Sequence, residues 1–324
     1  MEENIEQRVD LTLFSEKIQE LKDRIASVIV GQEQTVDLVL TAILANGHVL
    51  IEGVPGVAKT LLARLTARLI DADFSRIQFT PDLMPSDVLG TTVFNMKTNG
   101  FDFHQGPIFA DIVLVDEINR APAKTQAALF EVMEERQISI DGTTHRMGDL
   151  YTILATQNPV EQEGTYKLPE AQLDRFLMKI TMDYPSLEEE VNILERHHTN
   201  AALVKLDDIV PAITKEELLS LRAFMNQVFV DRTLLQYIAL IVQQTRTSKA
   251  VYLGASPRAS VAMLQSSKAY ALLQGRDFVT PEDIKFVAPY VLQHRLILTA
   301  EAEMEGYSPV KVTQRLIDKV EVPK

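Results

Sequence analysis

The sequence predicts an α/β protein in two parts, a core that alternates strands with helices and a smaller helical domain behind it. Short apolar runs that end in polar or glycine residues recur up to residue 182, and segments of helical periodicity lie between them. After Pro185 the strand signals largely stop and apolar residues recur at helical spacing. We therefore place a core over residues 1–185 and a helical domain with a C-terminal tail over residues 186–324.

Composition limits the class of protein and its compartment. The 324 residues, 46% hydrophobic and 24% charged, fit about two globular domains. Cysteine is absent, which excludes disulfides and thiolate zinc sites, and the adjacent His197 and His198 have no third ligand at metal spacing, so we assign no transition metal. The net charge of −13 disfavours nucleic acid as a partner. The acidic amino terminus and the lack of a long apolar run predict a cytoplasmic protein without a membrane segment.

The core elements follow from local patterns. Two helices are expected over residues 11–46 and one over 123–136. Two hairpin inserts are expected near residues 90–106 and 137–147, because Asn99-Gly100 and Asp141-Gly142 are strong turn signals between strand-like runs. The five strand candidates of the core are residues 49–51, 76–80, 111–115, 151–156 and 176–182.

The second domain is predicted from helical periodicity and helix-start signals. Thr280 followed by Pro281 is typical of a capped helix start, and Ser256-Pro257 begins another helix. The tail after residue 300 should form a terminal helix or a loose end. The five expected helices cover residues 187–198, 215–229, 232–247, 257–274 and 281–298.

Residues 48–61 predict a phosphate-binding loop, since they combine an apolar strand, a glycine turn ending in Lys-Thr, and the start of a helix. Gly53 and Gly56 let the backbone curl around phosphates, Lys59 supplies a charge, and Thr60 offers a hydroxyl to magnesium. Ala58 departs from the pattern G-x-x-x-x-G-K-[ST], a change that costs little if the residue is already helical. The alternative is an ordinary glycine-containing turn.

Two carboxylates end the buried strand 111–115. A strand without alternation is buried on both faces, so Asp116 and Glu117 should emerge in the crevice where open α/β sheets bind ligands. Asp116 suits coordination of magnesium, and Glu117 suits polarising the water that attacks a terminal phosphate. A solvated acidic strand end is the alternative interpretation.

Three further residues are candidates for contact with the nucleotide. Asn158 follows the strand 151–156 and would lie beside the carboxylates if the sheet is parallel; alternatively it is a turn residue before Pro159. Arg175 is either a surface arginine paired with Asp174 or Glu170, or a charge offered to a neighbouring subunit's nucleotide. Arg258 lies in the first turn of a helix, the wrong pole of the helix dipole for a cation, which favours a phosphate partner over an incidental arginine.

Together, five motifs resemble the MoxR family of AAA+ ATPases over roughly residues 12–300. The family carries alanine where Ala58 stands, so this departure supports the match. The motifs are Gly53-Val54-Pro55-Gly56-Val57-Ala58-Lys59-Thr60, Val113-Leu114-Val115-Asp116-Glu117, Ala155-Thr156-Gln157-Asn158-Pro159, Leu173-Asp174-Arg175-Phe176 and Gly254-Ala255-Ser256-Pro257-Arg258-Ala259.

The resemblance implies a P-loop AAA+ core with a parallel five-stranded sheet, an all-α lid domain, and a ring, usually a hexamer, that hydrolyses ATP with Mg²⁺. It assigns Asp116 and Glu117 to the Walker B motif, Asn158 to sensor 1, Arg175 to the arginine finger given to the next subunit, and Arg258 to sensor 2. The hairpin at Asn99-Gly100 corresponds to the family's helix-2 insert. The implied nucleotide-binding residues are Gly53, Val54, Pro55, Gly56, Val57, Ala58, Lys59, Thr60, Leu61 and Asp116, with Thr60 and Asp116 also as metal ligands.

The implied function is that of a chaperone that remodels or activates a partner protein, in this family often one with a von Willebrand factor A domain, or that aids insertion of a metal cofactor. Three other functions stay open. A nucleic-acid translocase or helicase would show steeply salt-dependent DNA binding. A non-hydrolysing nucleotide switch would show no turnover, and a magnesium-chelatase-like ATPase subunit would differ in the partner that co-purifies.

Overall fold

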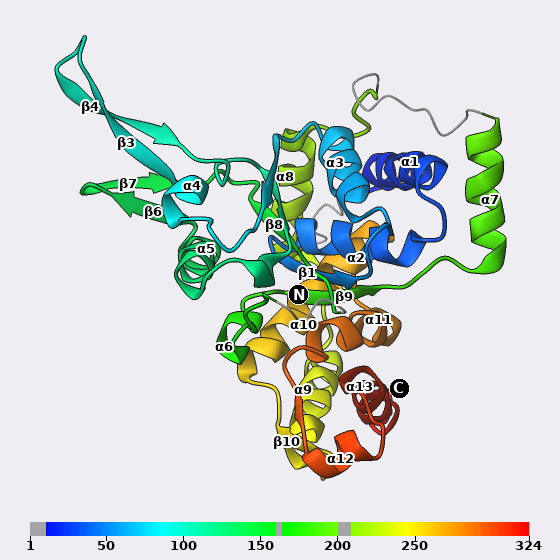
Figure 1. Ribbon diagram of the computed structural model, residues 1–324. Helices are drawn as coiled ribbons and strands as arrows, with labels where there is room; N and C mark the ends of the chain where they lie inside the picture. The colour runs from blue at the N-terminus through cyan, green and yellow to red at the C-terminus, as the bar shows by residue number, and fades with distance from the viewer. Residues whose placement is uncertain (1–10, 160–163, 200–208, 324) are drawn as a thin grey trace, which may run out of the picture.

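A five-stranded parallel sheet forms the centre of the computed structural model, which describes residues 11–159, 164–199 and 209–323 (Figure 1). The acidic amino terminus and Lys324 lie outside these residues. All neighbouring strands are parallel, in the order β2-β5-β8-β1-β9, which confirms the predicted core fold. The strands are β1 (Val49–Gly53), β2 (Phe74–Gln78), β5 (Ile112–Asp116), β8 (Thr152–Gln157) and β9 (Met178–Met182).

Apolar side chains cover both faces of this sheet, which is why its strands lack the alternation of a half-exposed strand. On one face Leu50, Val113 and Ile153 join the cluster under helix α5 (Ala123–Glu135). On the other face Ile51 and Leu114 join the cluster that includes the first three helices. These helices are α1 (Thr12–Val28), α2 (Glu33–Leu44) and α3 (Lys59–Leu69).

Two hairpins project from the core on one side (Figure 1), as the turn signals predict. Strands β3 (Gly90–Asn95) and β4 (Gly100–Gln105) form the longer hairpin, which follows the short helix α4 (Pro85–Leu89). Strands β6 (Gln137–Ile140) and β7 (Thr143–Arg146) form the shorter one. Its turn residues Asp141 and Gly142 have φ of 49° and 79°, the left-handed conformation that a two-residue hairpin loop requires at both positions.

Helix α8 (Lys215–Phe224) packs against α2 of the core, although it follows the predicted domain boundary, whereas helix α7 (Leu187–His198) buries none of its residues and is joined to the end of α1 by polar contacts. Arg196 of α7 donates to the carbonyl oxygens of Ala26 and Ser27 at 3.1 and 2.7 Å. Arg222 of α8 donates to the carbonyl oxygen of Ile43 at 2.6 Å. Helix α8 ends five residues before the expected residue 229, and the short 3-10 helix η3 (Met225–Gln227) continues from it.

The lid is helical, as expected, and one short pair of strands accompanies its helices. Strands β10 (Val251–Leu253) and β11 (Ile297–Leu298) pair antiparallel. The predicted helix over 281–298 ends at Leu292, because the side chains of Gln293 and His294 turn to bind the carbonyl oxygens of Lys179 and Phe176 at 2.5 and 3.1 Å. The lid helices are α9 (Arg232–Thr247), α10 (Pro257–Leu273), α11 (Pro281–Leu292), α12 (Ala300–Met304) and the terminal α13 (Pro309–Asp318).

The short 3-10 helix η1 (Ile118–Arg120) follows β5, and the short helix α6 (Glu170–Leu173) precedes β9. The thirteen labelled α-helices differ widely in length, from four to seventeen residues. Within the described part of the chain, none of them is both long enough and apolar enough to span a lipid bilayer.

Candidate functional site

The loop between β1 and α3 folds as a backbone cradle at the carboxyl-terminal edge of the sheet. Helix α3 begins at Lys59, so its first N–H groups face the loop, and the Lys59 ammonium donates to the carbonyl oxygen of Gly53 at 2.5 Å. Gly53 is needed for packing, because a Cβ there would stand 2.8 Å from the carbonyl oxygen of Met182 on β9. Gly56 has φ of 89°, the left-handed region that favours glycine, and a side chain there would point into open space.

We expect alanine in place of glycine at position 58 to cost little if the residue is helical. The structure shows that Ala58 is not helical. It adopts φ of 60° and ψ of 21°, the left-handed conformation, immediately before α3. A non-glycine residue pays roughly 1–2 kcal/mol of strain there. The chain therefore carries a strained alanine at the mouth of the phosphate loop, where glycine would fit without strain.

The two acidic residues at the end of β5 are held by different partners. Asp116, whose residue exposure is 7%, accepts a hydrogen bond from the Thr156 hydroxyl at 3.1 Å. That hydroxyl in turn accepts from the Glu117 backbone N–H at 3.0 Å, so Thr156 of β8 fixes both acidic residues to the neighbouring strand. Glu117 has φ of 57°, and its carboxylate remains partly exposed at 31%. The left-handed turn aims this carboxylate away from the strand.

Strand order brings the predicted catalytic groups of the core together. Strands β5, β8 and β1 are adjacent, and they end in Asp116-Glu117, Asn158 and the phosphate loop respectively. Asn158 is buried, with 8% exposure, in the strand end between the carboxylates and the loop. Burial lowers the pKa of Lys59, while the nearby carboxylates of Asp116 and Glu117 act to raise it. The lysine therefore lies within electrostatic reach of both acids.

Strand β2 supplies two site residues that the sequence analysis missed. Arg76 Nε donates to Asp116 Oδ2 at 2.6 Å, and Gln78 Nε2 donates to Glu117 Oε2 at 2.7 Å. Arg120 lies 3.2 Å from the same Glu117 oxygen. Arg76 and Gln78 are two residues apart on β2 and therefore lie on the same face of the strand. This spacing identifies them as site residues only once β2 is known to pair with β5.

The donor atoms at this edge fit a magnesium ion. Mg²⁺ usually takes one or two carboxylates together with substrate phosphates and waters. The Asp116 carboxylate and the Thr60 hydroxyl, in the first turn of α3, are oxygen donors of this kind. An ionised carboxylate has about four acceptor positions, so the contacts with Thr156 and Arg76 leave room for the ion or its water.

Arg175 and Arg258 lie at the opposite, amino-terminal edge of the sheet. Arg175 precedes β9, whose first residue Met178 pairs with Val49 at the start of β1. Since β1 has five residues at roughly 3.3 Å each, this edge is about 16 Å from the phosphate loop of the same chain. The structure therefore does not bring either arginine to its own phosphate loop.

One carboxylate on α5 holds both arginines. Glu134 Oε2 lies 2.6 Å from Arg175 Nη1, and Glu134 Oε1 lies 3.1 Å from Arg258 Nη2. Arg175 also donates to the carbonyl oxygen of Phe130 at 2.6 Å. Its ion-pair partner is thus Glu134, neither of the two acids considered from the sequence. The same carboxylate offsets the unfavourable dipole position of Arg258 at the start of α10.

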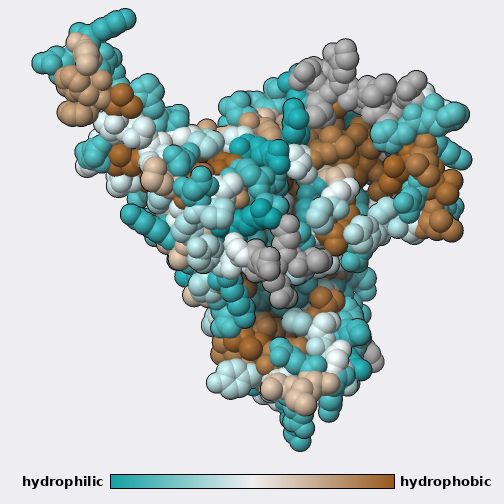
Figure 2. Space-filling model, in the orientation of Figure 1, coloured by the Kyte–Doolittle hydropathy of each residue, from teal (hydrophilic) through white to brown (hydrophobic). Residues whose placement is uncertain are grey.

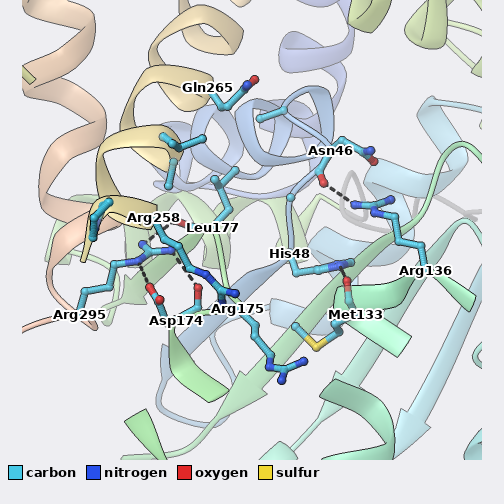
Figure 3. A pocket seen from close by; sticks show the side chains of 15 residues that line it. Asn46, His48, Met133, Arg136, Asp174, Arg175, Leu177, Arg258, Gln265 and Arg295 are labelled. Carbon is cyan, nitrogen blue, oxygen red and sulfur yellow. Dashed lines mark hydrogen bonds and ion pairs between the residues drawn. The ribbon is translucent and has the colours of Figure 1, made fainter. Parts of the chain in front are cut away.

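Asp174, the residue before Arg175, connects the core to the lid. It accepts from Arg295 Nε at 2.6 Å, and the Ser256 hydroxyl lies 3.4 Å from its other oxygen. Arg295 has a side-chain exposure of only 4%. Figure 3 shows Asp174, Arg175, Arg258 and Arg295 around a pocket of about 520 Å³ that His48 also lines. Sequence spacing could not indicate this cluster, because Arg258 and Arg295 are far from Asp174 and Arg175 along the chain.

Comparison with known proteins identifies both parts of the chain. Residues 48–178 match the ATPase family associated with various cellular activities (AAA), and residues 243–318 match the AAA lid domain. The chain is 45% identical over 306 residues to Chaperone MoxR1 of Mycobacterium tuberculosis, covering 92% of this chain and 80% of that protein. It is 30% identical over 317 residues to Protein MoxR of Methylorubrum extorquens, covering 91% of each.

Two further similarities extend along nearly the whole chain. The uncharacterized protein YeaC of Bacillus subtilis is 48% identical over 301 residues, covering 93% of each chain. A crystal structure of a candidate ATPase from Cytophaga hutchinsonii superposes with a TM-score of 0.89 at 41% identity, covering 97% of each chain. The similarity thus includes the core, the lid and the helices between them.

Proposed function

This chain belongs to the MoxR family of AAA+ ATPases, and we propose that it hydrolyses ATP at sites shared between neighbouring copies and uses this to remodel a protein client. ATP hydrolysis itself follows from the family. One observation carries the proposal of shared sites. The phosphate loop, Asp116, Glu117 and Asn158 meet at one edge of the sheet, whereas Arg175 and Arg258 lie at the other edge.

At the carboxyl-terminal edge, each group has a role that its position supports. The first N–H groups of α3 and the Lys59 ammonium hold the phosphates. The partly exposed Glu117 carboxylate polarises the attacking water, and Asn158, between the acids and the loop, orients that water or the terminal phosphate. Mg²⁺, held by Thr60 and Asp116, would supply positive charge against the phosphate oxygens. This half of the site binds nucleotide within one chain.

The arginines complete the site of the next copy. An interface that joins one edge of the molecule to the opposite edge of its neighbour is head-to-tail, and it closes into a ring when the rotation permits. The family resemblance implies six copies in this ring. In this arrangement Arg175 and Arg258 of one chain stabilise charge on the phosphates held by the loop of another. Hydrolysis therefore depends on assembly, and specific activity should fall when the protein is diluted below its assembly concentration.

The water-polarising role is tested by replacing one carboxylate. We expect Glu117→Gln to lower the rate of phosphate release at least ~100-fold, since a general base contributes about 10²–10⁴-fold. Binding of a fluorescent ATP analogue should be retained, because the loop and Lys59 are intact. Lys59→Ala is the contrasting variant and should lose the binding itself. Wild-type turnover by Glu117→Gln would show that another group activates the water.

The client is proposed to be a protein, often one with a von Willebrand factor A domain in this family, whose activation or metal loading the ATPase assists. The β3–β4 hairpin supports a protein contact, because it exposes Phe94, Met96 and Phe101 at 46%, 89% and 73% near its tip (Figure 2). Phe94 and Phe101 pair edge to face with centroids 5.2 Å apart, which keeps this apolar surface ordered. The relative from Mycobacterium tuberculosis is named a chaperone.

The hairpin's part in client binding can be tested with the slow Glu117→Gln protein, which should retain clients. Replacing Phe94 and Phe101 with serine in that background should reduce the recovered client, because it removes the exposed apolar pair. The same double substitution in the otherwise unchanged protein should leave basal ATP hydrolysis intact, since the hairpin lies outside the nucleotide site. Equal client recovery with and without the two phenylalanines would contradict a role for this hairpin.

A further inference from the structure

We propose that Glu134 is a positioning residue for catalysis, which holds Arg175 and Arg258 as a pair directed at the nucleotide of a neighbouring copy. This inference rests on the proposed function of the two arginines. Its basis is that a single carboxylate takes one arginine on each oxygen, Arg175 at 2.6 Å and Arg258 at 3.1 Å. The three residues come from α5, from the loop before β9 and from the lid helix α10.

The contacts leave the arginines able to bind phosphate. A guanidinium has five N–H donors. Glu134 takes Nη1 of Arg175, which also donates to the Phe130 carbonyl oxygen, and Nη2 of Arg258. Because Arg175 Nε is buried, Arg175 offers its Nη2 to a phosphate, and Arg258 offers Nη1 and Nε. Arg258 keeps 62% of its side-chain surface exposed and Arg175 keeps 29%. Glu134 itself is 35% exposed, so the cluster lies at the surface and not in the core. A phosphate group of another molecule can therefore reach the pair without unfolding of either chain.

Charge explains why a carboxylate is needed between them. Two guanidinium groups beside one another repel, and the repulsion grows as a site is closed off from water. The negative charge of Glu134 offsets this repulsion while the three groups together keep a net charge of +1. Such a cluster still attracts a polyphosphate. Without Glu134, the exposed Arg258 would have no reason to remain beside Arg175.

Glu134 and the nearby Asp174 both connect the segment that carries Arg175 to the lid. Asp174, the neighbouring acid, is engaged with Arg295 and the Ser256 hydroxyl, at 2.6 and 3.4 Å. Asp174 thereby links the segment that carries Arg175 to the start of helix α10, which carries Arg258, because Ser256 is the N-cap residue of that helix. Glu134 then fixes the two arginine side chains relative to each other. Movement of the lid would consequently change both arginines together.

The first test is Glu134→Gln, which keeps the size of the side chain and removes its charge. We expect kcat for ATP to fall roughly 10-fold or more, because the charged hydrogen bonds that hold the two arginines are lost. The affinity for a fluorescent ATP analogue should not change, because the phosphate loop lies at the other edge. Glu134→Asp, which keeps the charge, should retain more activity than Glu134→Gln. Glu135→Gln, an exposed acid on the same helix, is the matched control and should behave as wild type.

Mixed assemblies show whether Glu134 acts on the neighbour's site. A Lys59→Ala subunit cannot turn over ATP but has intact arginines and Glu134, so mixing it with Glu134→Gln protein should raise turnover above that of either variant alone. Wild-type kcat in Glu134→Gln, or a loss that this mixing does not repair, would overturn the proposal. A mixture of Arg175→Ala and Lys59→Ala proteins separates the role of Glu134 from the proposal that sites are shared between copies. If that mixture recovers activity, only the role of Glu134 has failed; if it does not, shared sites have failed as well.

Discussion

His48 should make the folded protein less stable in mild acid. Its imidazole is buried immediately before β1, where Nδ1 accepts from the Ile153 N–H at 3.0 Å and Nε2 lies 3.1 Å from the carbonyl oxygen of Met133. This requires the neutral ring with its proton on Nε2. A second proton on Nδ1 would face the Ile153 N–H. Burial, followed by the nearby charge of Arg136, lowers the pKa of His48 from 6.5 to about 3.

The size of the effect follows from this pKa difference. Below pH 6.5 the unfolded chain binds a proton that the folded chain resists, so the free energy of unfolding decreases as the pH falls toward 3. Between pH 7 and pH 5 the loss amounts to about 2 kcal/mol from this residue alone, at 1.36 kcal/mol per pKa unit. Above pH 7 the contribution is constant. His294 adds a loss in the same direction, because burial also lowers its pKa.

Urea unfolding followed by far-ultraviolet circular dichroism at pH 7 and pH 5 measures this loss. His48→Gln removes the titrating ring, so its free energy of unfolding should change less between the two pH values than that of the wild type, by about 2 kcal/mol. His104→Gln, a change on an exposed strand of the β3–β4 hairpin, should leave the difference unaltered. An identical pH dependence in His48→Gln and wild type would refute the reasoning.

Substitutions at three other positions have outcomes fixed by the structure. Ala58→Gly should keep ATPase activity and change the unfolding free energy by less than about 1 kcal/mol, because relief of strain and a larger unfolded-state entropy oppose each other. Ala58→Val should be clearly destabilising, and thermal unfolding distinguishes the two variants. Gly53→Ala should destabilise, because its Cβ would stand 2.8 Å from the Met182 carbonyl oxygen. Asp174→Asn should lower the unfolding free energy by about 3 kcal/mol in urea titration, since the buried Arg295 loses its counter-ion. Equal stability of Asp174→Asn and wild type would mean that the backbone carbonyls suffice for Arg295.

The parts of the site that sequence reasoning found are those set by local pattern. Asp116, Glu117 and Asn158 each follow a buried strand, and the carboxyl ends of parallel strands meet at one edge of a sheet. The phosphate loop likewise follows from a strand, glycines and a helix read in order. No knowledge of distant contacts is needed for these residues. Their convergence on three adjacent strands follows from the strand order.

The parts that sequence reasoning missed depend on pairing between distant segments. Arg76 reaches Asp116 across 40 residues, and Glu134 reaches Arg258 across 124 residues. Sequence alone offers only nearby acids such as Asp174 and Glu170 as partners for Arg175, whereas the structure pairs it with Glu134 on α5. Helix α11 ends earlier than its periodicity predicts for a similar reason, because the Gln293 side chain contacts the carbonyl oxygen of Lys179 on β9.

The central claim is that one chain supplies the phosphate loop and its neighbour supplies the arginines, and mixing two inactive variants tests it most directly. Arg175→Ala should retain ATP binding and lose hydrolysis by up to ~10³-fold, while Lys59→Ala should lose nucleotide binding. In mixed assemblies an intact loop can meet an intact arginine, so the phosphate release rate should rise above that of either protein alone. A mixture that forms the same assemblies yet releases phosphate no faster than its components would contradict a site shared between chains.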